Sequence, residues 1–340
     1  MLNQMLEARK LPPLKDRAQM LAILQAQVYG FLPPKPERVI FENKGPIINN
    51  LAGKARCEKI IAHCTVNGLP YSFPFYATIP TDGQKHPFFV HINFRPEVFD
   101  RYMPTEELVD NGFAVLSFGY EDVTPDNDRF IEGLPRVLFP DGKRKPSDPG
   151  KIAMWAWAAH RLMDYAQTLP GELDLTKGIV CGHSRLGKTT LFAAATDGRF
   201  AMAYSNNSGC TGAALSRGKN GESIARICER YGYWFCENYR EYRGKEEEMP
   251  FDQHYLLASI APRPVCVGSA TLDAWADPIS EQLCCLAAAP AFGGDFICDR
   301  PAQEGDAFFE GRIGYHLRKG MHYFSRTDWL RLMEFVAKHL

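Results

Sequence analysis

The sequence has no run of about 18 consecutive apolar residues, the length that a helix needs to cross a membrane. It also has no excess of charge of one sign, because 39 lysine and arginine residues stand against 40 aspartate and glutamate residues. A chain with a net charge of −1 has no long-range attraction to nucleic acid or to anionic lipid. We therefore expect neither a membrane nor a nucleic acid as a partner.

Metal-binding and disulfide patterns are absent as well. None of the ten cysteines stands in a C-x-x-C pair or at zinc-finger spacing. Cys181 and Cys266 lie in apolar runs, where a thiol packs as a small hydrophobic group. Asp122, Asp126 and Asp128 lack the glycine and the distal glutamate of a calcium loop, so we interpret them as turn formers. The sequence therefore predicts structural thiols and no bound metal.

The first 15 residues mix charged residues with prolines and lack the apolar segment of a secretory signal. This pattern predicts a cytoplasmic protein for the chain as it is written. It predicts a secreted or periplasmic protein if a leader has been removed.

With 45% hydrophobic residues, the chain has the composition of a folded globular protein. After the first quarter of the chain, short apolar runs alternate with helical stretches. The predicted strands are Phe88–Asn93, Phe113–Phe118, Ile179–Cys181, Ala201–Ser205, Val265–Gly268 and Ile313–Leu317. The predicted helices are Pro104–Asn111, Lys151–Thr168, Arg185–Thr196, Pro278–Ala288 and Arg326–Leu340. Buried strands separated by helices indicate an α/β protein with a mostly parallel central sheet between helical layers.

The N-terminal part follows another pattern. Apolar residues at helical spacing predict a helix over Lys15–Tyr29. Antiparallel edge strands are expected over Arg56–Ile79, with a hairpin turn at Asn67-Gly68. We predict one domain over residues 1–340, with residues 1–55 packed on it as a helical or extended segment. Residues 121–150 and 239–250 are expected to be a surface loop and a solvated charge run.

The segment from Gly178 to Thr190 fits two motifs. From Gly182 to Thr189 it matches the G-x-x-x-x-G-K-[ST] loop that binds nucleotide phosphates. Around Ser184 it also matches the nucleophile elbow G-x-S-x-G, except that Leu186 stands at the place of the second glycine.

The order of residues farther along the chain favours the elbow. A nucleophilic serine needs a histidine base and a carboxylate, which in α/β-hydrolases follow in the order serine, acid, histidine. Asp273 follows a predicted late strand, and His322 precedes the last predicted helix. Each residue alone has a structural explanation, since Ser184 and Asp273 suit helix caps. Their joint occurrence in this order predicts a serine hydrolase.

Several segments resemble carbohydrate esterase family 15, the glucuronoyl esterases of the α/β-hydrolase superfamily, and its bacterial branch in particular. The residues that carry the resemblance are Gly182-His-Ser-Arg-Leu-Gly-Lys188, Ser208–Arg217, Gly221-Glu222, Asp273-Ala-Trp275, Gly320-Met-His322 and Asp328-Trp329. The resemblance implies an α/β-hydrolase-type three-layer sandwich. It also implies hydrolysis of esters of (4-O-methyl-)glucuronic acid, as in lignin-carbohydrate or glucuronoxylan-derived esters, with no cofactor.

The resemblance further implies a role for each site residue. Ser184 would be the nucleophile of an acyl-enzyme mechanism, His322 the general base, and Arg185 the stabiliser of the oxyanion. The uronate contacts would be Lys188, Glu222 and Trp275.

One position departs from the family pattern. Many members carry a catalytic glutamate where this chain has Asn207. We therefore assign the acid to Asp273, with Asp277 as the alternative. The competing functions are an acetyl-xylan or other sugar-ester deacylase, a nucleotide-binding protein with a P-loop, and a non-catalytic carbohydrate-binding relative.

Overall fold

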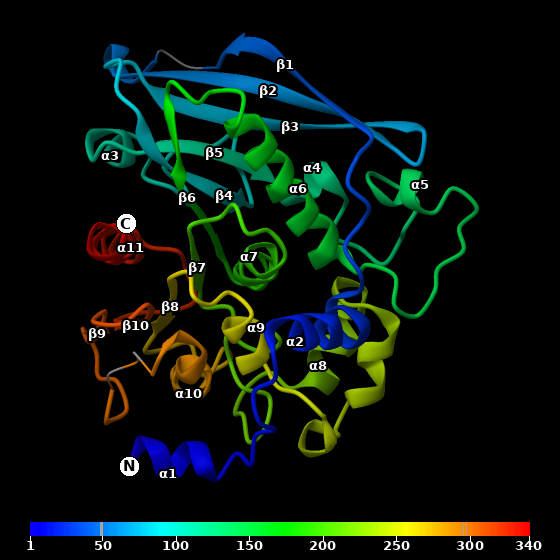
Figure 1. Ribbon diagram of the computed structural model, residues 1–340, viewed down its shortest axis with the longest axis vertical. Coiled ribbons are helices and arrows are strands. Elements are labelled where there is room, and N and C mark those ends of the chain that lie inside the picture. The colour runs from blue at the N-terminus through cyan, green and yellow to red at the C-terminus, as the bar shows by residue number, and fades with distance from the viewer. Residues whose placement is uncertain (48–49, 295, 297) are drawn as a thin grey trace.

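The computed structural model describes residues 1–47, 50–294, 296 and 298–340. Within them a single twisted sheet of ten strands runs through the molecule in the order β1-β2-β3-β5-β4-β6-β7-β8-β10-β9 (Figure 1). The strands are β1 (Arg38–Pro46), β2 (Ala55–Val66), β3 (Leu69–Pro80), β4 (His86–Asn93), β5 (Ala114–Gly119), β6 (Leu173–His183), β7 (Met202–Asn206), β8 (Val265–Ala270), β9 (Ala307–Phe308) and β10 (Ile313–Arg318).

Strands β4, β5, β6, β7, β8 and β10 pair in parallel, whereas β1, β2 and β3 join one edge and β9 the other through antiparallel pairs. This arrangement confirms the predicted mostly parallel sheet with antiparallel N-terminal edge strands. Asn67 and Gly68 form the turn between β2 and β3 with φ of 52° and 72°, the left-handed conformation that such a hairpin requires.

Helices cover both faces of the sheet. The α-helices are α1 (Leu2–Glu7), α2 (Arg17–Leu24), α3 (Thr105–Asp110), α4 (Tyr120–Val123), α5 (Pro135–Leu138), α6 (Lys151–Ala166), α7 (Arg185–Thr196), α8 (Ile224–Tyr231), α9 (His254–Ala258), α10 (Pro278–Ala288) and α11 (Arg326–His339). Shorter helical turns are η1 (Gln25–Tyr29, a π-helical turn), η2 (Asn50–Gly53), η3 (Gly232–Trp234), η4 (Glu237–Tyr242), η5 (Glu246–Glu248) and η6 (Ala289–Phe292). Helices α3 and α11 lie on one face of the sheet, and α6 and α7 lie on the other (Figure 1).

The alternating strand residues explain these layers. Phe88 and Val90 of β4 pack into the core under α6 and α7, while Phe89 points into the core under α3 and α11. Both faces of the central strands are therefore buried, as expected for a parallel sheet between helices. The result is the predicted three-layer α/β sandwich.

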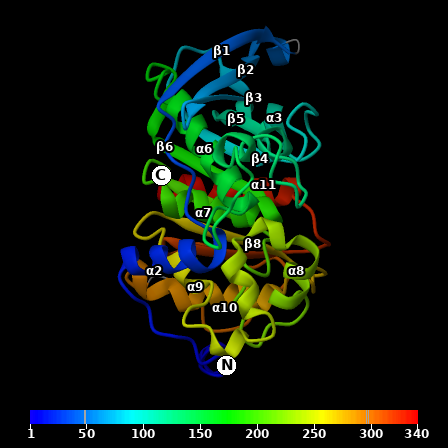
Figure 2. The same ribbon diagram turned by 90° about the vertical axis from the view of Figure 1, so that its right-hand side faces the viewer.

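The N-terminal segment packs along the side of the sandwich. Helix α2 lies against α9 in both views (Figures 1 and 2), and the carbonyls of Pro12 and Pro13 accept hydrogen bonds from His254 and Tyr255. The predicted helix over residues 15–29 begins two residues late, because Asp16 caps it, and ends in the π-helical turn η1. The single-domain assignment stays a prediction.

Several short or edge elements were not predicted from the sequence, among them β1 and α8. Strand β1 lies at the edge of the sheet and packs Val39 and Phe41 against the core, but the exposed Ile40 between them hides the polar–apolar alternation of a half-buried strand. Helix α8 has only eight residues and lies in a stretch rich in charge. The predicted loop over residues 121–150 contains the short helices α4 and α5, and the charge run over residues 239–250 contains η4 and η5.

The described residues contain no disulfide, and nine of the ten cysteines are buried. None of the described helices is long and apolar enough to cross a membrane.

Substitution of Trp329 by alanine tests how α11 is held on the sheet. The Trp329 ring is almost fully buried, stacks on Phe324 at 4.5 Å and meets Phe89 at 5.5 Å. We expect Trp329→Ala to lower the free energy of unfolding by about 3–5 kcal/mol, because it leaves a cavity under the helix. Denaturant unfolding measures the loss, and substitution of the exposed Leu330 by alanine is the matched control.

Candidate active site

Ser184 lies at a sharp turn between β6 and α7. Its φ of 59° and ψ of −127° belong to a strained backbone conformation that only its surroundings can maintain. The Ser184 amide donates to Asn206 O at 2.8 Å, while the amides of Gly187 and Lys188 donate to Ser184 O. These last two amides are therefore unavailable to a phosphate group, and the nucleotide-binding alternative does not fit this loop.

Glycine at position 187 explains the departure from the elbow motif at Leu186. A Cβ atom on Gly187 would meet Ser205 Oγ at 2.9 Å and Ser208 Cβ at 3.0 Å. The close approach of α7 to the end of β7 thus requires glycine at position 187, one residue later than the motif expects. Leu186 is fully buried in the core on the α7 side.

The structure brings Ser184, His322 and Asp273 together in one hydrogen-bonded chain. His322 Nε2 lies 2.9 Å from Ser184 Oγ, and His322 Nδ1 lies 2.6 Å from Asp273 Oδ2. Ser184 follows β6, Asp273 follows β8 and His322 follows β10, so all three stand at the carboxyl ends of parallel strands. This is the arrangement in which a histidine takes the proton of a serine hydroxyl.

Asn207 completes the surroundings of Asp273. Its side-chain amide donates to Asp273 Oδ2 at 2.8 Å, the same oxygen that meets His322. Burial disfavours the charged carboxylate, but the hydrogen bond and charge of His322 and the amide of Asn207 outweigh it and lower the pKa of Asp273. Asp277, the alternative acid, instead caps α10 and bonds to Ser280.

A buried arginine that the sequence analysis missed holds the loop of His322. The Arg318 guanidinium donates to the carbonyl oxygens of Lys319 and Met321 at 3.0 and 3.1 Å, and it also bonds to Tyr323 O. Its Nε donates to Asp328 Oδ2 at 2.6 Å. No motif marks this residue, because its partners are backbone atoms that only the folded loop presents.

His183 lies directly behind the reactive imidazole. The centroids of the His183 and His322 rings are 4.5 Å apart, and His183 Nδ1 lies 2.7 Å from Asn206 Oδ1. Burial lowers the pKa of His183 to about 3, and the neighbouring His322 acts in the same direction. Because His183 is neutral, it does not repel a positive charge on the neighbouring His322 ring.

Arg185 is the first residue of α7, where an amide has no acceptor within the helix. Its guanidinium forms an ion pair with Asp126 from the loop after β5. Asp126 does lie in a turn, since the Asn127 amide donates to Pro125 O at 2.9 Å, but its carboxylate also binds side chains from distant parts of the chain. The spacing of the aspartates contains no sign of these partners.

The three predicted uronate contacts lie in different settings. Lys188 is 4% exposed, and its ammonium donates to Ser208 O. Burial lowers the pKa of Lys188, while the nearby carboxylate of Glu222 opposes this change. Trp275 is 40% exposed, and its carbonyl accepts a hydrogen bond from the Glu222 amide at 3.1 Å.

Gly221 allows the loops of Glu222 and Trp275 to approach each other closely. Its φ is +72°, and a Cβ atom there would meet Ala274 O at 2.5 Å and Trp275 O at 2.6 Å. Arg226 and Arg230 of α8 place their guanidinium groups 5.4 and 5.9 Å from the Trp275 ring.

Glu281 on α10 is a buried carboxyl group that the sequence analysis also missed. It accepts hydrogen bonds from Gly209 N at 2.8 Å and from Ser269 Oγ at 2.5 Å. Burial raises the pKa of Glu281 to about 7, although both donors act in the opposite direction. Its hydrogen bond from Gly209 N connects α10 to the loop that carries Asn207.

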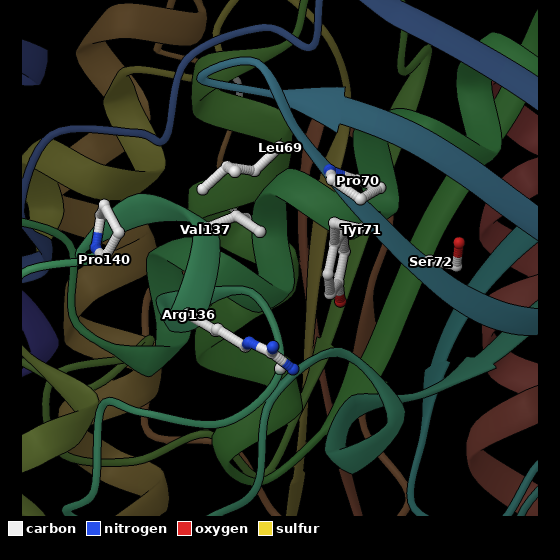
Figure 3. Close-up of a pocket in the computed structure, with 8 residues that line it drawn as sticks. Leu69, Pro70, Tyr71, Ser72, Arg136, Val137 and Pro140 are labelled. Atoms are coloured by element: carbon white, nitrogen blue, oxygen red, sulfur yellow. The ribbon is translucent and has the colours of Figure 1, made fainter.

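A pocket of about 510 Å³ lies away from this chain of side chains, between the start of β3 and helix α5 (Figure 3). Neither Ser184 nor Asp273 nor His322 lines it. In the residues that the structure describes, no three histidine, cysteine, aspartate or glutamate side chains are grouped to hold a metal ion.

Comparison with known proteins identifies the family. The model of the family described as "Glucuronyl esterase, fungi" matches residues 63–293. The chain belongs to the glucuronyl esterase family. It is 39% identical to carbohydrate esterase MZ0003 from an unknown prokaryotic organism, over 69% of this chain and 55% of that one. It is 26% identical to 4-O-methyl-glucuronoyl methylesterase 1 of Wolfiporia cocos, over 80% of this chain and 65% of the relative. It thus spans 55% and 65% of the lengths of these two curated relatives.

A solved structure extends the comparison. A promiscuous esterase of carbohydrate esterase family 15 from a marine bacterial metagenome superposes with a TM-score of 0.86 at 29% sequence identity. The match covers 96% of this chain and 91% of that one. The fold class and the resemblance to this family are therefore confirmed.

The buried carboxyl group of Glu281 predicts a pH dependence of stability. Its pKa rises from 4.5 to about 7 on folding, so between these values the folded protein keeps a proton that the unfolded chain has released. The free energy of unfolding should then fall as pH rises through this window, by at most ~1.4 kcal/mol per pH unit. We expect Glu281→Gln to lose this fall, whereas substitution of the exposed Glu229 by glutamine should keep it. Urea unfolding at pH 5, 6 and 7 measures the difference; parallel curves for Glu281→Gln and the wild type would contradict it.

Proposed function

We propose that the protein is a serine carboxylic-ester hydrolase that cleaves esters of glucuronic acid and of 4-O-methyl-glucuronic acid. The observation that carries the proposal is the chain of contacts from Ser184 Oγ through His322 to Asp273, at 2.9 and 2.6 Å. Membership of the glucuronyl esterase family and likeness to a protein named 4-O-methyl-glucuronoyl methylesterase support the substrate class.

The reaction begins with attack of Ser184 Oγ on the ester carbonyl carbon, while the hydroxyl proton passes to His322 Nε2. Asp273 stabilises the imidazolium that forms, and the proton then goes to the departing alcohol oxygen as the carbon–oxygen bond breaks. Water attacks the resulting acyl-enzyme with His322 again as the base, which releases the uronate and restores the serine.

Negative charge develops on the carbonyl oxygen during both steps. The amide of Arg185 at the start of α7 and the guanidinium of the same residue are the donors that we assign to this oxygen. Donors fixed before the reaction stabilise such charge without reorganisation, and loss of one such donor typically costs ~10²–10³ in rate.

The acid part of the ester lies, in this proposal, against Lys188, Glu222 and Trp275. Lys188 lies in the first turn of α7, four residues after the N-cap Ser184. Trp275 is 40% exposed and offers apolar ring surface and an N–H donor to a sugar. In glucuronoxylan or lignin-carbohydrate esters, the alcohol would leave toward the exposed side of His322.

Two model substrates test the substrate class. We expect higher kcat/KM for methyl or benzyl glucuronate than for 4-nitrophenyl acetate, because the three contacts recognise the acid side of the ester. Ser184→Ala should lower kcat on the glucuronate by at least ~10³-fold. Faster cleavage of the acetate would instead indicate a sugar-ester deacylase, and binding of uronate with no Ser184-dependent hydrolysis would indicate a non-catalytic relative.

The two candidate acids give a matched pair of variants. Asp273→Asn should lower kcat by about 10²–10⁴-fold, because the imidazolium loses its carboxylate. Asp277→Asn should lower it by less than ~10-fold, since this residue serves the cap of α10. Steady-state hydrolysis of methyl glucuronate compares them, and a larger loss for Asp277→Asn would refute the assignment.

A further inference from the structure

Asp126 lies at a point where three separate parts of the chain meet. Its side chain is 7% exposed. Its carboxylate accepts a hydrogen bond from Trp234 Nε1 at 2.6 Å, another from the Tyr120 hydroxyl at 3.4 Å, and the ion-paired bond from Arg185 Nη1. A carboxylate with three donors from three elements cannot move without breaking several charge-assisted bonds.

The guanidinium that Asp126 holds is enclosed by aromatic rings. Its central carbon lies 4.7 Å from the ring centre of Trp234 and 5.7 to 5.9 Å from those of Tyr231, Phe94 and Tyr120. Within the described part of the chain, Arg185 Nε is buried and has no hydrogen-bond partner. Asp126 therefore occupies Nη1 and Nε is enclosed, while the Arg185 side chain as a whole is 24% exposed at the elbow.

The loop that carries Asp126 is itself fastened on both sides. The buried ammonium of Lys151 donates to Thr124 Oγ1 at 2.6 Å and to Arg129 O at 3.0 Å. The hydroxyl of Tyr233 donates to the backbone oxygen of Asp126 at 3.1 Å. The position of the carboxylate is thus determined by α6 and η3 and not by the loop alone.

We propose that Asp126 is a positioning residue of the hydrolase, which fixes the Arg185 guanidinium so that the N–H groups left outside the ion pair and the ring enclosure meet the oxygen that becomes negative. The role rests on the proposed function, because it requires an oxyanion beside Ser184. In a purely structural role, substitution of Asp126 would lower kcat whether or not Arg185 is present. In the proposed role, it lowers kcat only when Arg185 is present.

A double-mutant cycle tests this dependence. We expect Asp126→Asn to lower kcat on methyl glucuronate by about 10- to 100-fold, with KM changed by less than ~3-fold, because the amide keeps the Trp234 contact but loses the ion pair. Asp128→Asn, an exposed aspartate in the same loop, should leave kcat unchanged. In an Arg185→Ala background, Asp126→Asn should change kcat by less than ~3-fold.

Other outcomes overturn the proposal in distinguishable ways. The positioning role would be refuted if the two substitutions lowered kcat independently, so that the loss in the double variant equalled the product of the single losses. It would also be refuted if Asp126→Asn had a kcat equal to or above that of the wild type, or if Arg185→Ala kept the wild-type kcat. In each case the hydrolase function would still stand. A wild-type protein without Ser184-dependent hydrolysis would refute the function itself.

If Asp126→Asn fails to fold, as thermal melting would reveal, Trp234→Phe is the substitute. It keeps an aromatic ring over the guanidinium and removes only the N–H donor to Asp126. We expect a smaller loss of kcat that again disappears in the Arg185→Ala background, and a loss that persists there would refute the proposal.

Discussion

The hydrogen bond of 2.6 Å between Asp273 Oδ2 and His322 Nδ1 is the interaction on which the site depends. It joins two loops that follow neighbouring parallel strands, β8 and β10, and that are also tied by backbone bonds from Thr271 to Arg318 and from Leu272 to Gly320. The imidazole is therefore oriented by a carboxylate whose own loop cannot drift away from it. Arg318 adds to this by binding three carbonyl oxygens of the histidine loop, which is the second source of rigidity.

Charge around the imidazole is controlled by burial. His183 is held neutral behind His322, so the positive charge of an imidazolium meets no second cation there. On the other side, Asn207 donates to Asp273 where a second carboxylate would repel it. An amide in this position stabilises the ionised form of Asp273, because a hydrogen bond to the charged form favours it. Asn207 thus suits an active site whose acid follows β8.

The side chain of Arg185, which we assign to the oxyanion, is held by a separate set of contacts. Arg185 has a long flexible side chain, and such a chain would have to be ordered during the reaction if nothing held it. The carboxylate of Asp126 and the four surrounding rings order it beforehand. The ring stack of Tyr231 on Trp234, 4.1 Å apart and nearly parallel, keeps one wall of this enclosure flat.

The layers of the fold and the chain order of the site residues could be predicted from the amino-acid pattern alone. Buried apolar runs alternating with amphipathic helices lead to a parallel sheet between helices, and the carboxyl ends of its strands must meet at one edge. The common edge at which Ser184, Asp273 and His322 meet, after the parallel strands β6, β8 and β10, follows from that rule. The sequence could not reveal the roles of Asp126, Arg318 or Glu281, because their partners are 6 to more than 100 positions away or are backbone atoms. Only the tertiary structure decided which carboxylate meets the imidazole and which one meets the arginine, since hydrogen bonds depend on distances of a few tenths of an ångström that no local pattern encodes.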